Sequence, residues 1–282
     1  MRQKTFINNT PTLYLVATPI GNLLEFTPRA IEILKQVSLI GCEDTRTSGV
    51  LLKHFEITTP VASYHKFNEK ESVERFLSVL EEGKDIALIS DAGYPLVSDP
   101  GSVLVNRAIE EGYNVTTISG SCAFLNALVA SGFSLSRFTF VGFLDSKSSA
   151  RKKELEELKE NKETLIFYES PHRIKESIED MFKAFGDRNV VIARELTKKF
   201  EEYIRGKLSD VLEDIESLKG EIVVIVEGNT KEKEEISDND LLQEIAELKK
   251  NGKKNKEIVS FLCDKYNLKK NNVYDLVVKK ED

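Results

Sequence analysis

The sequence predicts an α/β protein of two domains that ends in a small helical extension, and three observations lead to this prediction. Short runs rich in Val, Ile and Leu alternate with amphipathic, helix-length segments from residue 12 to about 228. Such runs are typical of strands buried under helices on both faces. The length of 282 residues, 40% of them hydrophobic, allows two cores of ordinary size. Beyond residue 230 the strand-like runs stop.

The first domain is expected to comprise residues 1–124. Helix-length segments with apolar residues at helical spacing separate its strand-like runs. Gly83 and Gly112 lie where two of these helices are expected to end. Asp44 lies at a strand end and just before a helix, so a capping role and a functional role both stay open. The expected strands are 12–18, 38–44, 61–65, 85–90 and 114–119, and the expected helices include 29–37, 47–55 and 72–82.

The second domain is expected to comprise residues 125–229. Residues 201–206 follow another strand without a helix between them, which predicts a mixed sheet. Pro171 suits the first turn of the helix 171–186, where its missing N–H costs nothing. The expected strands are 138–144, 164–169, 189–195, 201–206 and 221–228, and a further helix is expected at 149–161.

Residues 230–282 are expected to form a charged linker, 230–240, and a basic helical tail. From Lys249 to the end there are ten lysines against five acidic residues, a local charge of about +5 in a chain of net charge −7. These lysines either solvate two small helices, 255–266 and 271–280, or contact nucleic-acid phosphates. The apolar positions expected to form a small core are Ile258, Phe261, Leu262, Val273, Leu276 and Val277.

Composition excludes several classes of protein. The longest apolar stretches fall well short of the roughly 20 residues of a membrane span, and residues 1–10 lack the apolar core of a signal peptide. Cys42, Cys122 and Cys263 have no metal-ligand spacing, so no metal site is expected. We therefore expect a soluble cytoplasmic protein with reduced thiols.

Three loops rich in Gly and Pro follow strands of the first domain. They are TPIGN (18–22), DAGYPLVSDPG (91–101) and SGSCA (119–123). Ligands of an open α/β sheet lie outside the carboxyl ends of its strands, so the loops are expected to converge on one crevice. The G-x-G-x-x-G and P-loop fingerprints are absent, and SGSCA lacks the last glycine of a serine nucleophile elbow.

Five motifs, in this order and spacing, resemble the ribosomal RNA small subunit methyltransferase I family, which belongs to the tetrapyrrole methylase superfamily. They are LYLVATPIGNL, IGCEDTRTSGVLLKHF, ALISDAGYPLVSDPG, LIFYESPHRI and ARELTKKFEE, within residues 12–228. The resemblance implies a homodimeric enzyme that binds S-adenosylmethionine between two α/β domains. It also implies methylation of the ribose 2′-oxygen of a cytidine in the decoding region of 16S rRNA.

The resemblance further implies a set of cofactor-binding residues. They are Pro19, Gly21, Asp91, Ala92, Gly93, Pro95, Leu96, Val97, Ser121, Cys122, Ala123, Phe167, Tyr168, Glu195 and Leu196. The chain departs from the family pattern at Tyr94, where a threonine is usual, and at Ser119 and Ser121, where prolines are usual.

Methyl transfer to a hydroxyl needs positioning of the reactants and a base for the hydroxyl proton. The catalytic candidates are polar residues near strand ends: Glu43, Arg46, Asp99, Glu169, Arg173 and Lys198. Arg46 and Arg173 suit phosphate contacts, whereas Asp91 or Asp99 suits the sulfonium or ammonium of the donor. His172 and Lys198 suit the solvent-exposed surface equally well, and the sequence does not select the base.

Two alternatives stay open at this point. A superfamily methyltransferase acting on a tetrapyrrole or on a protein side chain would share the fold, although it needs neither phosphate-binding arginines nor a basic tail. A ribosome-binding protein without catalytic activity is favoured only by the departures at Tyr94, Ser119 and Ser121.

Overall fold

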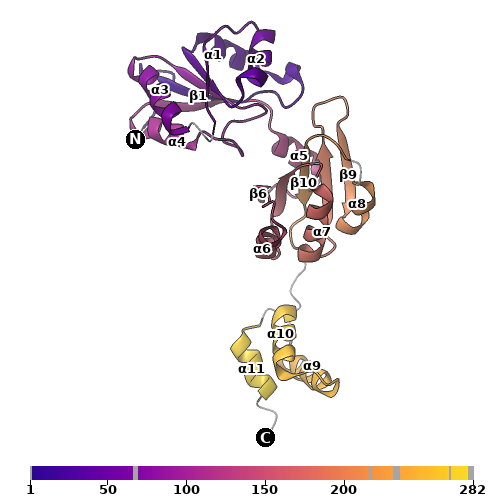
Figure 1. The fold of residues 1–282 in the computed structure, drawn as a ribbon. Coiled ribbons are helices and arrows are strands. Elements are labelled where there is room, and N and C mark those ends of the chain that lie inside the picture. The colour runs from indigo at the N-terminus through magenta and orange to yellow at the C-terminus, as the bar shows by residue number, and fades with distance from the viewer. Residues whose placement is uncertain (1, 66–68, 216–217, 231–235, 267, 279–282) are drawn as a thin grey trace. The chain divides into compact units, whose positions relative to one another are not determined.

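The computed structural model describes residues 2–65, 69–215, 218–230, 236–266 and 268–278. The chain divides into two compact units, Met1–Asn229 and Thr230–Asp282. The first unit holds two sheets, each with its own helices, and the described part of the second is helical (Figure 1). Among the described residues, no helix has both the length and the apolar character of a membrane span.

The first sheet has five parallel strands in the order β3-β2-β4-β1-β5. Every residue of β1, β2 and β4 is buried, as the continuous apolar runs predict. Parallel strands end at one edge of their sheet, so the loops after β1, β4 and β5 meet there. The strands are β1 (Thr12–Val16), β2 (Leu39–Cys42), β3 (Val61–Ser63), β4 (Ile86–Ile89) and β5 (Asn114–Ile118).

Helices cover both faces of this sheet. Along β1, Leu13 packs in the cluster that contains residues of α3 and α4, and Tyr14 packs with residues of α1 and α2. Asp44 caps α2, since its carboxylate accepts a hydrogen bond of 2.8 Å from the backbone N–H of Arg46. The helical elements are η1 (Leu23–Glu25), α1 (Pro28–Gln36), α2 (Thr45–His54), α3 (Glu69–Glu81) and α4 (Ser102–Glu110).

The second sheet is mixed, as predicted, and has the order β6-β7-β10-β8-β9. Only the pair of β6 and β7 is parallel; β10 runs antiparallel to both of its neighbours, and β9 runs antiparallel to β8. The start of β10 therefore lies at the same edge as the ends of β7 and β8. The strands are β6 (Phe138–Phe143), β7 (Thr164–Glu169), β8 (Asn189–Arg194), β9 (Glu202–Lys207) and β10 (Ile222–Val226).

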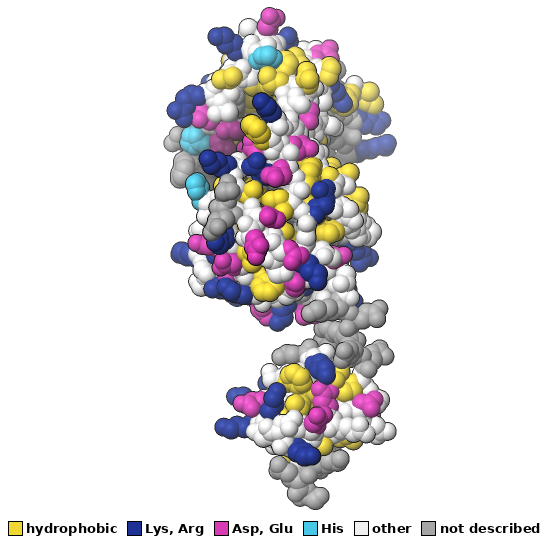
Figure 2. All heavy atoms as spheres, turned by 90° about the vertical axis from the view of Figure 1, so that its right-hand side faces the viewer, with side chains coloured by type: hydrophobic (Ala, Val, Ile, Leu, Met, Phe, Trp, Pro, Cys, Tyr) yellow, Lys and Arg dark blue, Asp and Glu magenta, His cyan; other side chains and the backbone are white. Residues whose placement is uncertain are grey.

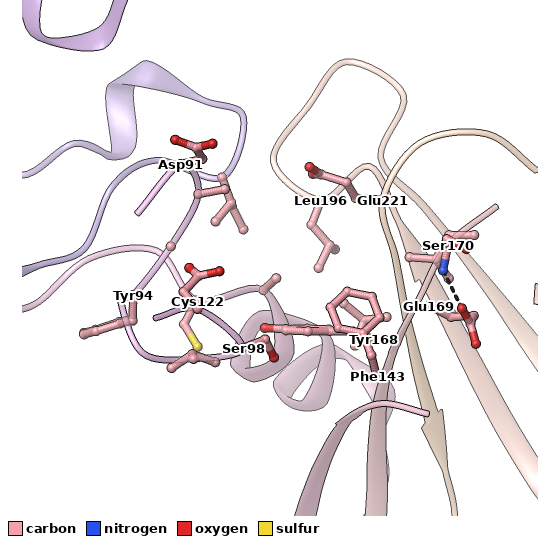
Figure 3. A pocket seen from close by; sticks show the side chains of 18 of the residues that line it. Asp91, Tyr94, Ser98, Cys122, Phe143, Tyr168, Glu169, Ser170, Leu196 and Glu221 are labelled. Carbon is pink, nitrogen blue, oxygen red and sulfur yellow. Dashed lines mark hydrogen bonds between the residues drawn. The ribbon is translucent and has the colours of Figure 1, made fainter. Parts of the chain in front are cut away.

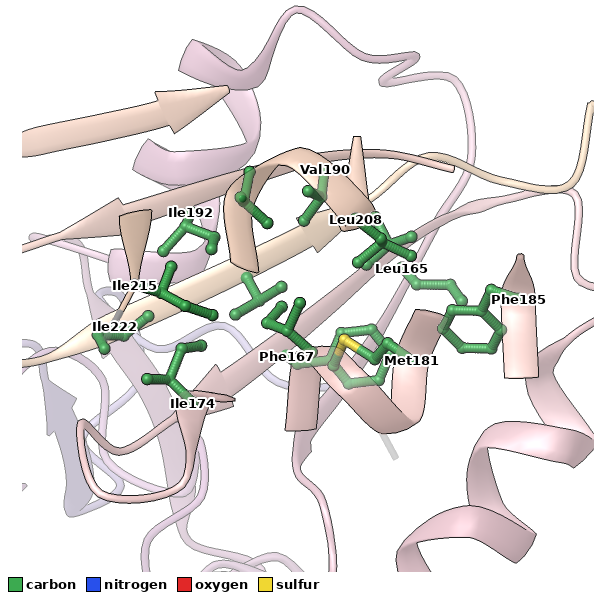
Figure 4. Close-up of a cluster of buried hydrophobic side chains, with 14 of the residues drawn as sticks. Leu165, Phe167, Ile174, Met181, Phe185, Val190, Ile192, Leu208, Ile215 and Ile222 are labelled. Carbon is green, nitrogen blue, oxygen red and sulfur yellow. The ribbon is translucent and has the colours of Figure 1, made fainter. Parts of the chain in front are cut away.

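The core of this second sheet lies between the strands and three helices (Figure 4). Met181 and Phe185 of α7 pack there against Phe167 and Ile192 of the sheet. On the opposite face, α5 packs Leu128 into a second apolar cluster. The helices are α5 (Ala123–Ser131), α6 (Ser148–Leu158), α7 (Ile174–Phe185) and α8 (Leu208–Asp214).

Two boundaries differ from the sequence-based expectation. Because α5 begins at Ala123 and packs on the second sheet, we propose that the limit between the two domains lies before α5 rather than after residue 124. The expectation for Pro171 was wrong: it lies in a turn before α7, which begins at Ile174. The carbonyl of Ser170 accepts hydrogen bonds from the N–H groups of Arg173 and Ile174. These bonds form a separate turn that contains Pro171 and precedes the helix.

The second unit contains three helices in its described part: α9 (Asp238–Lys250), α10 (Asn255–Tyr266) and α11 (Lys270–Val278). Residues 231–235 of the expected linker, 230–240, lie outside the described residues. Its last three residues belong to α9, which the Ser237 hydroxyl caps by accepting from the N–H of Asp240 at 3.2 Å. A small core forms as expected and includes Ile258 and Val273, to which α9 adds Leu241. Phe261 was wrongly expected there; its side chain is 40% exposed.

Candidate active site

A hollow of about 500 Å³ lies in the first unit, between strand-end loops of the first sheet and one edge of the second. Small-molecule sites commonly measure about 300 to 1,000 Å³, so its size suits a ligand of that kind. In Figure 3 the loop after β4 carries Asp91 and Tyr94 on one side, and Tyr168, Leu196 and Glu221 lie across from it. We call this space the first hollow.

Hydrogen bonds join the three loops that follow β1, β4 and β5. Thr18 and Gly93 exchange two backbone hydrogen bonds, of 2.9 and 3.1 Å. The backbone N–H of Gly120 donates to the hydroxyl of Tyr94 at 3.2 Å. Gly120 is also needed for space, because a Cβ at this position would lie 2.9 Å from the Cβ of Ala17. The predicted convergence of the three loops is confirmed.

The loops around the first hollow contain strained backbone. Leu96 and Ser98, in the loop after β4, have φ values of 71° and 69°. Glu195 and Thr197, in the loop after β8, have φ values of 50° and 68°. Left-handed conformations cost energy in residues with a side chain, and they gather at functional sites. Four of the five such residues in the described chain lie in these two loops, which supports a functional role for the hollow.

Three carboxylates, those of Glu43, Asp91 and Asp99, line the first-sheet side of the hollow. The pKa of Asp99 is raised to about 6. Burial is the largest cause, and the negative charges of Glu43 and Asp91 contribute the rest. Burial also raises the pKa of Asp91, although a hydrogen bond from the backbone of Asp44 offsets part of the rise. A bound cation would compensate these charges, so the hollow suits a positively charged ligand.

The second sheet contributes an aromatic wall. The rings of Phe143 and Tyr168 lie 5.5 Å apart, and Tyr168 also contacts Phe140 at 5.1 Å between ring centroids. Burial raises the pKa of Tyr168 to about 12, so its hydroxyl stays neutral in the physiological range. Such a wall suits the flat face of a ligand ring.

A second hollow, of about 560 Å³, adjoins the first. It lies between α2, the loop after β1 and the loop after β8. Lys198 lines it, and the ammonium of Lys198 lies 2.8 Å from Glu195 and 2.9 Å from Glu221. The two hollows share four lining residues: Ile20, Asp91, Ala92 and Glu221.

Most residues expected from the sequence border these two hollows. Those that line the first hollow are Glu43, Asp91, Ala92, Gly93, Val97, Asp99, Cys122, Ala123, Tyr168, Glu169 and Leu196. Those that line the second are Pro19, Gly21, Asp91, Ala92 and Lys198. The residues that line neither are Arg46, Pro95, Leu96, Ser121, Phe167, Arg173 and Glu195.

Phe167 fails to reach the hollow because successive side chains of a strand point to opposite faces of the sheet. Its neighbour Tyr168 lines the hollow, and Phe167 itself is completely buried in the core of the second sheet. The interpretation of Phe167 as a cofactor contact is therefore corrected.

The two arginines expected at phosphates are not brought together. The side chain of Arg46 is 89% exposed and lies 2.9 Å from the carboxylate of Asp44. Arg173 donates to the carbonyl of Leu144 at 2.7 Å and to Glu169 at 3.2 Å. The Glu169 carboxylate also accepts from the hydroxyl of Ser177 at 2.5 Å, so Glu169 and Arg173 form part of the structural support of β7.

Sequence reasoning missed a group of lining residues. Tyr94, which the sequence analysis singled out as a departure from the family pattern, also lines the hollow; the residues missed are Ile20, Ser98, Phe143, Ser170, Pro171, Gly220, Glu221, Ile222 and Val223. The last four lie at the start of β10, which reaches the hollow because β10 is antiparallel to β7 and β8. The predicted mixed sheet could have indicated these residues. The sequence analysis, however, expected a reversed strand only at residues 201–206 and not at β10.

Comparisons with known proteins agree with this arrangement. A family described as Tetrapyrrole (Corrin/Porphyrin) Methylases matches residues 12–212. Two solved structures share the fold at low sequence identity. A cobalt precorrin-4 methyltransferase of cobalamin biosynthesis is 17% identical with a TM-score of 0.59, and a uroporphyrin-III-C-methyltransferase from Thermus thermophilus is 18% identical with a TM-score of 0.55. Each comparison covers 77% of this chain and 94% of the other.

Sequence relatives are much closer. A protein of Bacillus subtilis is 42% identical over 93% of this chain and 92% of its own length, and one of Haemophilus influenzae is 45% identical over 94% and 95%. A protein of Halalkalibacterium halodurans is 50% identical over 77% of this chain and 76% of its own length. All three are named ribosomal RNA small subunit methyltransferase I.

Proposed function

Because this chain belongs to the ribosomal RNA small subunit methyltransferase I family of tetrapyrrole methylases, we propose that it methylates small-subunit rRNA with S-adenosylmethionine as donor. The acceptor is the ribose 2′-oxygen of a cytidine in the decoding region, as the resemblance of the five motifs implies. A tetrapyrrole acceptor is disfavoured, because the enzymes named for such substrates share only 17% and 18% identity with this chain.

The observation that carries the proposal is the chemistry of the first hollow. S-adenosylmethionine supplies an electrophilic methyl group on a positively charged sulfur. The carboxylates of Glu43 and Asp99 would compensate positive charge on this donor. Tyr168 and Phe143 offer an aromatic wall for a flat ring, and no described residue places a lysine or arginine in the hollow. The residues therefore fit a cationic donor better than an anionic ligand.

We assign Asp91 as the general base that accepts the proton of the ribose 2′-hydroxyl. Only two carboxylates line both hollows, those of Asp91 and Glu221, and a base must reach an acceptor that arrives from outside the donor site. Glu221 forms an ion pair with Lys198 at 2.9 Å, whereas no ion pair joins Asp91 to any described residue. The raised pKa of Asp91 makes it a better proton acceptor than an ordinary aspartate.

The proposed function is tested by incubating the protein and labelled S-adenosylmethionine with small ribosomal subunits from a strain that lacks the enzyme. Naked rRNA and a tetrapyrrole precursor serve as parallel substrates. We expect label in rRNA, at the 2′-oxygen of one cytidine by mass mapping. Tight donor binding without any label in rRNA would exclude the proposed activity.

Asp99 is expected to control donor binding. The variant Asp99→Asn should weaken donor affinity at least about 10-fold, because an uncharged amide no longer compensates the positive donor. Since the pKa of Asp99 is about 6, donor affinity of the unchanged protein should rise as the pH increases from 5 to 7. The variant should show little pH dependence in this window, and isothermal calorimetry at several pH values measures both effects.

The same variant should be more stable than the unchanged protein without donor. The folded-state pKa of Asp99 is raised, so its ionisation above about pH 6 opposes folding, and this cost disappears below the ordinary pKa of aspartate. Allowing for partial solvent screening, the gain for Asp99→Asn at pH 7 to 8 is roughly 1 to 2 kcal/mol. Urea denaturation at pH 7.5 and pH 4 measures it. An equal gain at both pH values would contradict the assignment of the raised pKa to Asp99.

We further propose that the protein acts in the cytoplasm as a homodimer and that its second unit contacts rRNA phosphates. The support for the RNA contact is the local excess of lysine after residue 249 and the exposed Phe261 ring. The ammonium groups of Lys253 and Lys265 lie 4.8 and 5.9 Å from the centre of that ring. Basic side chains beside an exposed aromatic ring are typical of RNA-binding surfaces.

Truncation after Asn229 is expected to raise the KM for small subunits about 10-fold or more and to leave donor affinity unchanged. Fewer phosphate contacts should also reduce the salt dependence of substrate binding, by a slope of about 0.7 to 0.9 for each lost contact. Steady-state kinetics at several salt concentrations measures both. The full-length variant Lys254→Gln with Lys256→Gln is the charge control. A parallel loss of donor affinity would show that the second unit is structural.

A further inference from the structure

The second hollow lies directly beside the proposed donor site. The proposed function gives no role to the lining residues that the second hollow does not share with the first. Ile20, Asp91, Ala92 and Glu221 separate the two spaces. A molecule in the second hollow would therefore lie next to the proposed donor site. Its volume of about 560 Å³ is ample for a nucleotide-sized group.

One face of α2 gives the second hollow its character. Arg46, Val50 and His54 are spaced four residues apart, so their side chains share one face of the helix. Val50 and His54 line the hollow, and Arg46 lies one turn before Val50. Val50 is 73% exposed, so its side chain is accessible to a bound molecule. This face offers an apolar contact between two groups that can carry positive charge.

Lining residues outside α2 extend the same pattern. Leu23, which is 42% exposed, lines the hollow near the start of η1. The aliphatic part of Lys198 packs against Gly21, where a Cβ would collide with it, and its ammonium lies 2.9 Å from Glu221. Exposed apolar side chains suit the face of a base, and nearby cations suit phosphate oxygens.

The charge of the two hollows differs accordingly. Five acidic residues and no described lysine or arginine line the first hollow, whereas Lys198 and His54 line the second together with only two acidic residues, Asp91 and Glu221. On the face of the molecule in Figure 2, acidic and basic side chains are interspersed. Recognition of an anionic RNA on such a surface depends on local groups of cations rather than on one broad basic field.

We infer that the second hollow binds the target nucleotide of the RNA. Its base packs against Leu23 and Val50, and its flanking phosphates lie toward Arg46 and Lys198. The inference rests on the proposed function, because it names where that function's substrate binds. It also explains why Asp91, on the shared wall, is the carboxylate that reaches the acceptor hydroxyl.

The first test uses Val50→Glu, which places a negative charge in the hollow at an exposed position. The matched control is Ile109→Glu on α4, because Ile109 is 46% exposed and lines neither hollow. We expect Val50→Glu to lower kcat/KM for small subunits 10- to 100-fold through a raised KM. Donor affinity by calorimetry should stay within about twofold, and the control should match the unchanged protein in both assays. Unchanged kcat/KM, or an equal loss of donor affinity, would overturn the inference.

The second test needs no turnover. p-Benzoylphenylalanine replaces Val50 or Ile109 in the full chain, and each protein is irradiated with small ribosomal subunits. We expect a crosslink to rRNA from position 50 and none from position 109; absence of an RNA crosslink at position 50 contradicts the inference. If the unchanged protein transfers no methyl group but position 50 still crosslinks to RNA, the proposed function is wrong and the nucleotide site stands.

Discussion

Replacing Asp91 by asparagine is expected to lower the maximal rate of rRNA methylation about 10²- to 10⁴-fold, the usual contribution of a general base. The amide has nearly the same shape but cannot accept the hydroxyl proton. Because Asp91 lines the second hollow as well as the first, the larger loss should appear in kcat, with a smaller loss of donor affinity. Single-turnover kinetics with small subunits, together with donor calorimetry, measures the two quantities separately.

The pH profile separates a chemical role of Asp91 from a structural one. A base must be ionised, so the single-turnover rate of the unchanged protein should rise with pH through the raised pKa of Asp91 and then level off. This limb should be absent from the residual activity of Asp91→Asn. Asp214→Asn, at the exposed end of α8, serves as the matched control and should keep both rate and profile. A normal kcat in Asp91→Asn would require another base.

Replacing Arg151 by methionine is expected to destabilise the first unit by roughly 3 to 5 kcal/mol. Arg151 of α6 is 2% exposed and donates to Asp180 of α7 through Nε at 2.9 Å. Its Nη2 lies 2.8 Å from Asp180 and 3.3 Å from Glu176. Without the guanidinium, Asp180 stays buried with only the ammonium of Lys152 nearby, at 3.7 Å. The penalty comes from this uncompensated charge.

Thermal unfolding followed by circular dichroism measures the effect, which should lower the Tm by roughly 8 to 15 °C for a unit of this size. The double variant Arg151→Met with Asp180→Leu should recover most of the loss, because no buried charge is left without a partner. Arg107→Met is the matched control: Arg107 is 39% exposed and its ion pairs with Glu74 and Glu111 are worth about 1 kcal/mol or less. Equal stability of Arg151→Met and the unchanged protein would show that the buried pair contributes nothing.

Much of the fold was predictable because local signals were strong. Each of the ten strands falls at an expected apolar run, and β7 has the expected bounds 164–169. The helix α9 was missed because Asp238 and Asp240 in its first turn resemble a charged linker, although Ser237 three residues before Asp240 is a capping signal. Pro171 was misplaced because its fixed φ suits a turn as well as a helix start.

The candidate site was predictable in part. The loops after β1, β4 and β5 converge as their glycines and prolines indicate, and Asp91 and Asp99 line the hollow. The role of Glu221 was hidden, because a residue at the start of a strand reaches the site only when that strand is reversed relative to its neighbours. Arg173 looked available from its motif, but hydrogen bonds to Leu144 and Glu169 engage it.

By itself the sequence determined the succession of the ten strands along the chain, the mixed second sheet and the three loops that border the first hollow. Hydrophobic periodicity and the backbone preferences of glycine and proline act over a few residues, so they can be read directly from the chain. Only the tertiary structure decided which polar groups are free to act. The pKa of Asp99 depends on burial and on Glu43 and Asp91, which come from separate segments. The division into two hollows likewise depends on how α2, the β4 loop and the start of β10 pack together.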